Sequence, residues 1–316
     1  MSSNPTARSR ALPVALLTAV LLTGLAACGS SAELPAAGGG SAGSGDAFQQ
    51  VVDAAPVAPA SAIPPGSLMA RIRARGTLNV GSTDAAALFS LKDPVTGKVT
   101  GFDAGLADML ATYIIGKPSV NRVQVDVTTR EVLLQNGTVD TVIATYTITP
   151  ERAKKVAFAG PYYSSGDAIL VKADNTGITK AADLNGKNVC TESSSTAAND
   201  IKQFAPSARI MLFQTNAECQ QAVEQGRADA YVLDQALLLG DAAQDKNVKV
   251  VGQPFTNEPY GIGLPLADPQ FKSFVNDWLK LIETNGDWAK LWKATIGTAL
   301  SGAAPTPPAI GSAAGS

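Results

Sequence analysis

Two arginines of this chain lie where helix electrostatics disfavours a cation. Arg152 follows Thr149-Pro150, which is typical of a helix start, with threonine as the N-cap and proline at the first helical position. Arg130 follows Thr128-Thr129 in a comparable place. The positive end of the helix dipole opposes a cation in the first turn, and a bound anion would explain both placements. The alternative is an ordinary solvated arginine at the surface, which is the usual case for a lone residue.

Hydroxyl and carboxylate groups take two similar places. Ser193-Ser194-Ser195-Thr196 opens the helix expected after a strand, and its hydroxyl and N–H groups could receive an anion. Asp234 directly follows the apolar strand expected at 230–233. Serine and aspartate are also favoured N-caps, so a purely structural role stays open for each. With Arg152 and the hydroxyls for a carboxylate and Asp234 for an ammonium, the set would satisfy an α-amino acid. Arg130 could then pair with a second, side-chain carboxylate.

The composition removes several classes of function. The chain has no histidine, which excludes histidine-based catalytic triads and imidazole metal sites. Its formal charge is −2 and neither sign forms a long run, so no nucleic-acid footprint is visible. We therefore expect neither an enzyme nor a cofactor or metal site. At 316 residues with 45% apolar content, the chain can bury one large core or two moderate ones.

Helical and strand patterns alternate along the folded part, which predicts α/β architecture with mainly parallel sheets. Strands are expected at 77–81, 122–127, 139–146, 168–171, 184–190, 208–213, 228–233, 249–251 and 260–264. Helices are expected at 68–75, 102–115, 130–136, 195–204, 217–225 and 235–243, with closing helices within 270–295.

The N-terminal segment is typical of an exported chain. Arg8 and Arg10 form a basic region, and the following apolar run is too short to span a membrane with conviction. It ends at Leu25-Ala26-Ala27-Cys28-Gly29, which resembles a bacterial lipobox. We expect residues 1–27 to be a lipoprotein signal peptide and Cys28 to carry acyl (palmitate) groups that anchor the protein at the membrane surface. A plain signal peptide that happens to contain a cysteine is the alternative.

Two further stretches have compositions that disfavour folding. Residues 28–66 and 301–316 are rich in Ala, Gly, Ser and Pro and are predicted to be a disordered tether and a disordered tail. Between them, Cys190 and Cys219 are the only cysteines besides Cys28. In an exported protein the simplest expectation is a disulfide between them, and two free buried thiols are the alternative.

Several of these stretches together resemble a known family. They are 143–163 (IATYTITPERAKKVAFAGPYY), 101–103 (GFD), 260–263 (YGIG) and 285–288 (NGDW). The resemblance runs from about residue 72 to residue 296 and is to the polar-amino-acid-binding proteins of ABC importers, also called family 3 solute-binding proteins. Within that family, the lipobox and the cysteine pair look most like the actinobacterial glutamate-binding lipoproteins.

The resemblance implies roles for individual residues. Arg152, the arginine of TITPER, would bind the ligand's α-carboxylate, assisted by Thr147 and the backbone around Thr145. Ser195-Thr196 would contact the same carboxylate from the other lobe, and Asp234 would accept the ammonium. Arg130 occupies the place of an arginine found in members that bind acidic amino acids, and Thr83 is a further candidate contact.

The chain also departs from the family pattern. Ser194 stands where glycine is usual, and Leu233 replaces a polar residue before the aspartate. Glu192 precedes the hydroxyl turn and is an awkward neighbour for an anionic side chain. The loop 83–89 lacks the aromatic residue that often covers the ligand, although Phe89 could partly serve.

The family implies a type II periplasmic-binding-protein fold with two lobes. Lobe 1 would comprise 67–161 and 261–300, lobe 2 would comprise 167–255, and 162–166 with 256–260 would form the hinge. A ligand that contacts both lobes stabilises their closed arrangement. We expect Arg130 and Arg152 on lobe 1, and Ser195, Thr196 and Asp234 on lobe 2.

The resulting hypothesis is an extracytoplasmic, lipid-anchored and monomeric protein that captures an amino acid and delivers it to an ABC permease. Glutamate or aspartate is the first expectation for the ligand, and glutamine or asparagine the second. A protein with the same binding site could instead report amino-acid levels to a membrane signalling partner, because the binding residues do not distinguish transport from sensing. A dehydratase acting on a prephenate-like substrate shares the fold, but no acid–base pair is evident here.

Overall fold

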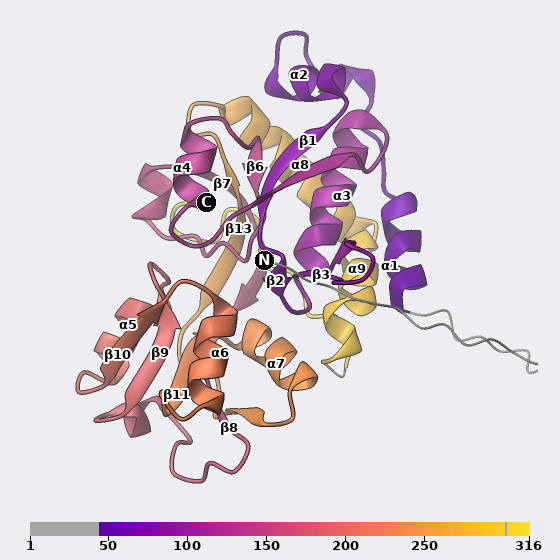
Figure 1. Cartoon of the computed structure of the whole chain (residues 1–316). Helices are drawn as coiled ribbons and strands as arrows, with labels where there is room; N and C mark the ends of the chain where they lie inside the picture. Colours follow the sequence, from indigo (N-terminus) through magenta and orange to yellow (C-terminus); the bar gives the residue numbers. More distant parts are fainter. Residues whose placement is uncertain (1–43, 301) are drawn as a thin grey trace, which may run out of the picture. The chain divides into compact units, whose positions relative to one another are not determined.

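The computed structural model describes residues 44–300 and 302–316. The expected signal peptide, Cys28 and the first part of the expected tether lie outside these residues. Two five-stranded sheets, each flanked by helices, carry the fold (Figure 1). We call the parts built on them lobe 1 and lobe 2.

The sheet of lobe 1 has the strand order β5-β1-β6-β13-β7. These strands are β1 (Leu78–Ser82), β5 (Val120–Gln124), β6 (Thr141–Val142), β7 (Ala157–Ser165) and β13 (Glu258–Leu264). Its main helices are α2 (Leu68–Arg75), α3 (Phe102–Ile115), α4 (Arg130–Gln135), α8 (Pro269–Thr284) and α9 (Asp287–Ala294). A small sheet of β2 (Ala85–Ala86), β3 (Ser90–Lys92) and β4 (Val99–Thr100) is also present.

The sheet of lobe 2 has the order β10-β9-β11-β8-β12. Its strands are β8 (Asp167–Lys172), β9 (Asn188–Glu192), β10 (Arg209–Phe213), β11 (Ala230–Asp234) and β12 (Val248–Val251). The helices α5 (Ala197–Phe204), α6 (Asn216–Glu224) and α7 (Gln235–Gln244) contact this sheet, and η3 (Ala181–Leu184) precedes β9.

Both sheets are mixed, whereas the sequence pattern predicts mainly parallel ones. In lobe 1, β5 and β6 run parallel to β1, but β13 runs antiparallel to β6 and β7. In lobe 2, β10 and β11 run parallel to β9, but β8 runs antiparallel to β11 and β12. The antiparallel pairs arise where the chain passes from one lobe to the other, because β7 leads directly into β8 and β12 leads to β13.

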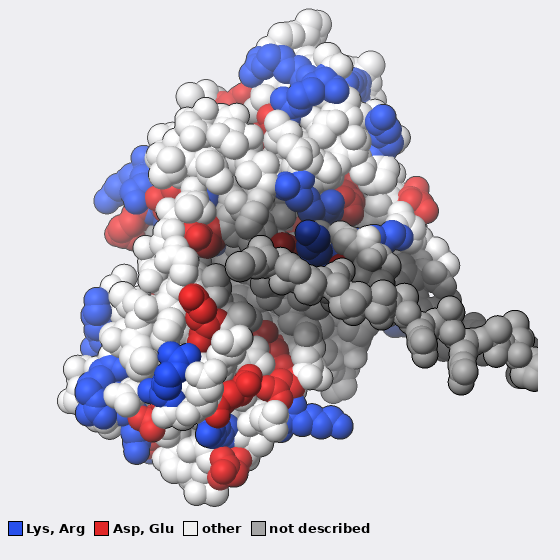
Figure 2. Space-filling model, in the orientation of Figure 1, with Lys and Arg blue, Asp and Glu red and all other residues white. Residues whose placement is uncertain are grey.

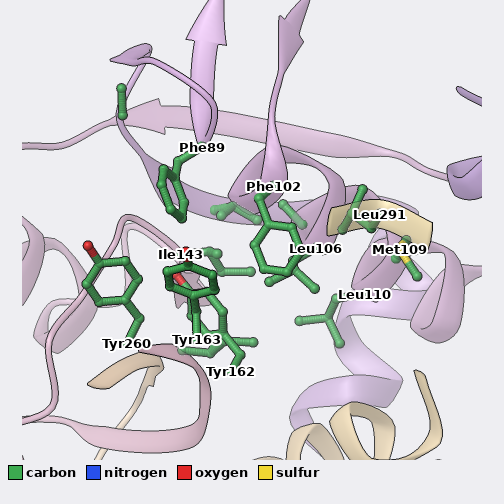
Figure 3. Packing of buried hydrophobic residues seen from close by; sticks show 14 of the residues in the cluster. Phe89, Phe102, Leu106, Met109, Leu110, Ile143, Tyr162, Tyr163, Tyr260 and Leu291 are labelled. Atoms are coloured by element: carbon green, nitrogen blue, oxygen red, sulfur yellow. The ribbon is translucent and has the colours of Figure 1, made fainter. Parts of the chain in front are cut away.

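Strands β7 and β13 carry these two passages side by side. Glu258 pairs with Ser165 and Tyr260 with Tyr163 in antiparallel register. Tyr260 and Tyr163 belong to a buried aromatic group in which Phe89 packs edge-to-face against both rings (Figure 3). Such pairs contribute about 0.5–1.5 kcal/mol beyond the area they bury. This packing stabilises strands β7 and β13 where they connect the two lobes.

The prediction of a disordered tether fails for residues 44–66. Helix α1 (Ser44–Asp53) contacts α3 and α9, and it buries Phe48 and Val52. The chain beyond α1 is also held, because the Ala58 N–H donates to the Tyr113 carbonyl at 2.8 Å. The composition conceals these contacts, since the few large apolar side chains lie one helical turn apart among small residues.

The predicted disordered tail is also held against lobe 1 where the structure describes it. The Gly311 N–H donates to the Gly160 carbonyl at 2.8 Å. Ile310 and Ala313 pack against buried apolar clusters of the lobe. Composition alone predicted disorder, but these contacts order residues 302–316.

The expected disulfide is absent, and the structure holds Cys190 and Cys219 as two free, buried thiols. Strand β9 lies against helix α6, which brings the two residues together as expected. The Cys190 S–H instead donates to the Cys219 carbonyl at 3.4 Å. The pair therefore contributes packing and a weak hydrogen bond rather than a covalent link.

Charges of both signs are mixed on the face shown in Figure 2, and basic side chains gather around α2. The helices that the structure describes include none with the length and apolar character needed to cross a membrane.

Candidate ligand-binding site

Two adjoining cavities lie between the lobes, with volumes of about 100 and 30 Å³. They share Arg130 and Thr145 of lobe 1 and Glu192 of lobe 2 in their linings. The smaller cavity is lined by almost every residue singled out from the sequence, namely Arg130, Thr145, Thr147, Arg152, Ser195, Thr196 and Asp234. Thr83 lines the larger one. The structure therefore brings all eight predicted residues to one continuous site.

Arg152 reaches the cavity from a short turn of 3-10 helix, η2 (Arg152–Lys154), in place of the predicted α-helix. The helix begins at Arg152 with Glu151 as its N-cap, two residues later than predicted, although the Thr149 hydroxyl does accept the Arg152 N–H at 3.2 Å. The guanidinium donates to the Thr147 carbonyl at 2.8 Å and, across the cavity, to the Ser194 carbonyl at 3.2 Å. Arg152 is buried, yet no carboxylate lies within ion-pair distance among the described residues. A buried cation in this state suits an anionic ligand.

Arg130 opens helix α4 and is buried flat against an aromatic ring. Its guanidinium carbon lies 3.8 Å from the centre of the Tyr146 ring, and Nη1 donates to the Ala144 carbonyl at 3.0 Å. Its Nε atom has no hydrogen-bond partner among residues 44–300 and 302–316. Burial, and then the charge of Arg152, lower the pKa of Arg130 to about 10. The residue stays cationic at neutral pH and keeps donors free for a ligand.

The backbone between these arginines is held in a strained form. Thr145 has φ = 43°, in the left-handed region that a β-branched residue rarely adopts. Its N–H donates to Asp103 Oδ2 at 2.7 Å, and Asp103 Oδ1 accepts the Tyr162 hydroxyl at 2.8 Å. Burial raises the pKa of Asp103 to about 7, against the lowering effect of these two bonds. The contact explains how the GFD stretch shapes the site without lining it.

The hydroxyl turn of lobe 2 is similarly strained. Ser194 has φ = 65°, in the left-handed region that favours glycine. The Ser195 hydroxyl donates to the Glu192 carbonyl at 2.7 Å and accepts the Ala198 N–H at 3.3 Å. The Thr196 hydroxyl donates to Glu258 Oε2 at 2.9 Å. Ser195 and Thr196 therefore line the smaller cavity while the Ser195 hydroxyl caps α5 and the Thr196 hydroxyl bonds to Glu258.

Asp234 ends strand β11, and its side chain makes no capping bond to α7. Its Oδ1 atom is buried and has no hydrogen-bond partner within the part of the chain that the structure describes. Burial, followed by the charge of Glu258, raises the pKa of Asp234 to about 7. The N-cap alternative is thereby set aside, and a carboxylate is left free for a cationic group.

The structure adds residues to the site that the sequence analysis did not assign to it. Glu192 lines both cavities, and burial raises its pKa to about 7 against the attraction of Arg130. Tyr146 forms the surface beneath Arg130. Gln214 and Asn216 line the larger cavity. Glu192 was visible as a departure before the hydroxyl turn, but nothing in the sequence marked the other three.

Comparison with known proteins gives one consistent family. A sequence model of the bacterial extracellular solute-binding proteins, family 3, matches residues 78–298. The glutamine-binding protein of Geobacillus stearothermophilus is 42% identical over 195 residues, which are 61% of this chain and 74% of that protein. The glutamate-binding protein GluB of Corynebacterium glutamicum is 32% identical over 234 residues, 70% of this chain and 79% of that one.

A solved structure agrees with these relatives. The ancestral amino acid-binding protein AncCDT-1, described as a precursor of cyclohexadienyl dehydratase, superposes with a TM-score of 0.66 at 39% identity. The match covers 73% of this chain and all of that one.

Proposed function

Because the chain belongs to family 3 of the bacterial extracellular solute-binding proteins, we propose that it captures a free amino acid between its lobes for an ABC importer. Family membership places it outside the cytoplasm and among binding proteins rather than enzymes. The observation that carries the proposal is a pair of opposite, buried charges in one cavity. Among the described residues, Arg152 has no carboxylate within ion-pair distance, and Asp234 Oδ1 has no hydrogen-bond partner.

These two charges suit the two ends of a zwitterion. The ligand's α-carboxylate binds the guanidinium of Arg152 and the turn at Ser195 and Thr196, and its ammonium binds Asp234. Each buried charge then gains a partner, which offsets the cost of its desolvation. Since Arg152 lies on lobe 1 and Asp234 on lobe 2, the ligand connects the lobes and favours their closure.

The ligand's side chain meets Arg130 and Glu192 together. Both line the two cavities, and their opposite charges attract each other. A side-chain amide can accept from Arg130 and donate to Glu192, whereas a carboxylate would be repelled by Glu192. We therefore expect glutamine to bind with the highest affinity and glutamate with the next highest, while asparagine and aspartate bind more weakly than both. The names of the two relatives, a glutamine-binding and a glutamate-binding protein, agree with these two ligands.

Calorimetry with glutamine, glutamate, asparagine and aspartate tests the proposal. The wild type is expected to bind glutamine most tightly. Glu192→Gln removes the repulsion and is expected to narrow or invert the preference for glutamine over glutamate, while Glu151→Gln, an exposed neighbour of Arg152, is the matched control. If the wild type binds none of the four amino acids, the proposed function is wrong.

We also propose that Cys28 anchors the monomeric protein to the outer face of the cytoplasmic membrane through its acyl groups. The support is the lipobox pattern at 25–29 together with the extracellular family. Labelling with a palmitate analogue in cells is expected to mark the wild type and to leave Cys28→Ala unmarked. An unmarked wild type that is exported would contradict the anchor without affecting the binding proposal.

A further inference from the structure

Three carboxylates from separate elements meet behind the proposed amino-acid site. Asp167 begins β8, Asp200 lies in α5 and Glu258 begins β13. One oxygen of each lies within 4.8 Å of the others. Two of these elements belong to lobe 2, whereas β13 belongs to the sheet of lobe 1. The cluster thus joins the lobes beside the strands that connect them.

Asp167 is the member that demands an explanation. It is 0% exposed, and neither of its carboxylate oxygens has a hydrogen-bond donor among the described residues, because Asp200, the side chain within hydrogen-bonding reach, is itself a carboxylate. Within residues 44–300 and 302–316, no lysine or arginine forms an ion pair with any member of the cluster. A buried carboxylate that lacks both donor and countercharge is strongly disfavoured. Its two oxygens can be satisfied by a positive ion that the other two carboxylates also contact.

The carboxylate of Glu258 is held in place by hydrogen bonds to two hydroxyl groups. Its Oε2 accepts the Thr196 hydroxyl at 2.9 Å, and its Oε1 accepts the Thr256 hydroxyl at 3.2 Å. The Asp167 N–H also donates to the Thr256 hydroxyl, at 2.7 Å. These bonds fix the carboxylates relative to one another and surround them with further oxygen atoms. Asp200 is half-buried, so the cluster has a side that reaches solvent.

We propose that Asp167, Asp200 and Glu258 bind a hard metal cation, with Ca²⁺ as the fitting ion. The side chains that converge there offer oxygen ligands alone, which favours Ca²⁺ or Mg²⁺ over softer metals. Ca²⁺ tolerates an irregular set of carboxylates, whereas Mg²⁺ demands near-octahedral geometry. The three residues are far apart in the sequence, which is why no metal motif was visible there.

A cation at this position would act on the amino-acid site through two contacts. Asp234 is the cross-strand partner of Asp167 in the β8–β11 pair. Thr196 joins the hydroxyl turn to Glu258. The ion would therefore offset negative charge behind the ammonium acceptor and tie β13 to lobe 2. The proposal goes beyond amino-acid capture and does not depend on the identity of the ligand.

The test uses the purified full chain, stripped with EDTA and titrated with Ca²⁺ or Mg²⁺ in the absence of amino acids. Calorimetry is expected to show one Ca²⁺ site per chain, and thermal unfolding should shift upward with Ca²⁺ concentration. Asp200→Asn is expected to weaken Ca²⁺ binding at least tenfold, and Asp167→Asn to abolish it. Asp277→Asn, an exposed helical aspartate outside the cluster, should bind as the wild type does.

Each outcome decides the proposal. Asp200 is partly exposed, so its variant is expected to fold, which circular dichroism checks even if Asp167→Asn does not fold. A wild type that shows neither heat nor a thermal shift at millimolar Ca²⁺ and Mg²⁺ would overturn it. Unchanged Ca²⁺ binding in Asp200→Asn would overturn it as well. Since amino acids are absent, these results are independent of the proposed ligand.

Discussion

Arg152 holds its position through main-chain carbonyls of both lobes, at Thr147 and Ser194, rather than through a carboxylate. Its charge therefore remains available to the ligand. We expect Arg152→Ala to weaken amino-acid binding by about 30-fold or more, since loss of a buried charge pair costs about 2–5 kcal/mol. Arg152→Lys should recover part of this loss, because a point charge lacks the paired donors of a guanidinium.

Calorimetry with glutamine measures both variants. Lys154→Ala is the matched control, because this cation lies in the same turn but is exposed. An Arg152→Ala protein that is folded and binds glutamine as tightly as the control would remove Arg152 from the site.

Asp234 makes binding depend on pH. Burial first, and the charge of Glu258 next, raise its pKa to about 7 in the ligand-free protein. The ligand's ammonium requires the ionised carboxylate and lowers that pKa on binding. Glutamine affinity is therefore constant well above pH 7 and falls by up to about tenfold per unit below it. Calorimetry from pH 5 to 8 should show this fall, with proton release near pH 6.5, and a pH-independent affinity would contradict the assignment.

Glu192 is expected to favour binding of an acidic ligand as the pH falls, in contrast to the effect of Asp234. Burial raises its pKa to about 7, so it gains a proton as the pH falls through that value. Protonation removes its repulsion of a side-chain carboxylate and leaves an amide ligand less affected. The ratio of glutamate to glutamine affinity is therefore expected to rise between pH 8 and pH 5. Glu192→Gln should abolish this rise, and a rise that persists in the variant would assign it to another group.

Among single residues, those with unusual placement were predictable. Arg152 and Arg130 stood out as cations in first helical turns, and Asp234 as a carboxylate at the end of a strand. Tyr146 and Gln214 have no such mark, because an aromatic at a strand end or a glutamine in a loop is ordinary in any protein. Tyr146 enters the site because its ring packs beneath Arg130, and Gln214 because the two lobes meet there; local sequence contains neither contact.

At the scale of elements, helix α1 shows where composition misleads. The stretch that contains it is rich in Ala, Gly, Ser and Pro, yet Phe48 and Val52 are spaced by one turn and are both buried against lobe 1. Helix α3 has a glycine where the Phe48 ring packs against it, so the ring can approach closely. A Cβ placed on Gly105 would lie 3.1 Å from the Phe48 ring. The sequence alone does not show that this surface of α3 lies next to Phe48, because that contact depends on the fold.

We expect Phe48→Ala to lower the free energy of unfolding by about 3–5 kcal/mol, as is typical when a buried phenylalanine is truncated. Urea unfolding of the wild type and variant measures the difference. Gln49→Ala, an exposed neighbour in the same helix, should change the value by less than about 0.5 kcal/mol. If both variants unfold together with the wild type, α1 does not stabilise lobe 1 and the tether prediction would hold after all.

At the scale of the whole molecule, the resemblance to family 3 is confirmed by the family match over residues 78–298, and with it the two-lobed fold. The strand pattern alone yielded α/β alternation but not the mixed sheets. The antiparallel pairs depend on where the chain passes between the lobes. These passages are made by β7 and β13, which pair with each other although they are far apart in the sequence. Proximity of the cysteines was likewise predictable, whereas their state as thiols was not.

Closure of the lobes is supported by a contact at the edge of the larger cavity. Gln214 of lobe 2 donates from Nε2 to Thr128 Oγ1 at 2.8 Å and to Asp126 Oδ2 at 3.3 Å, both in lobe 1. Gln214 and Asp126 both line that cavity, so the contact joins the two lobes beside it. Because the bonds exist only when the lobes meet, they stabilise the closed arrangement and not the open one.

Gln214→Ala is therefore expected to speed ligand release about two- to tenfold, since an exposed hydrogen bond contributes about 0.5–1.5 kcal/mol. The association rate should change little, because ligand enters the open arrangement in which the bonds are absent. Release of radiolabelled glutamine into excess unlabelled glutamine measures the rate. Gln225→Ala is the control, because the side chain of Gln225 bonds to Arg227 within lobe 2. Equal release rates in the two variants would show that this contact plays no part in holding the lobes together.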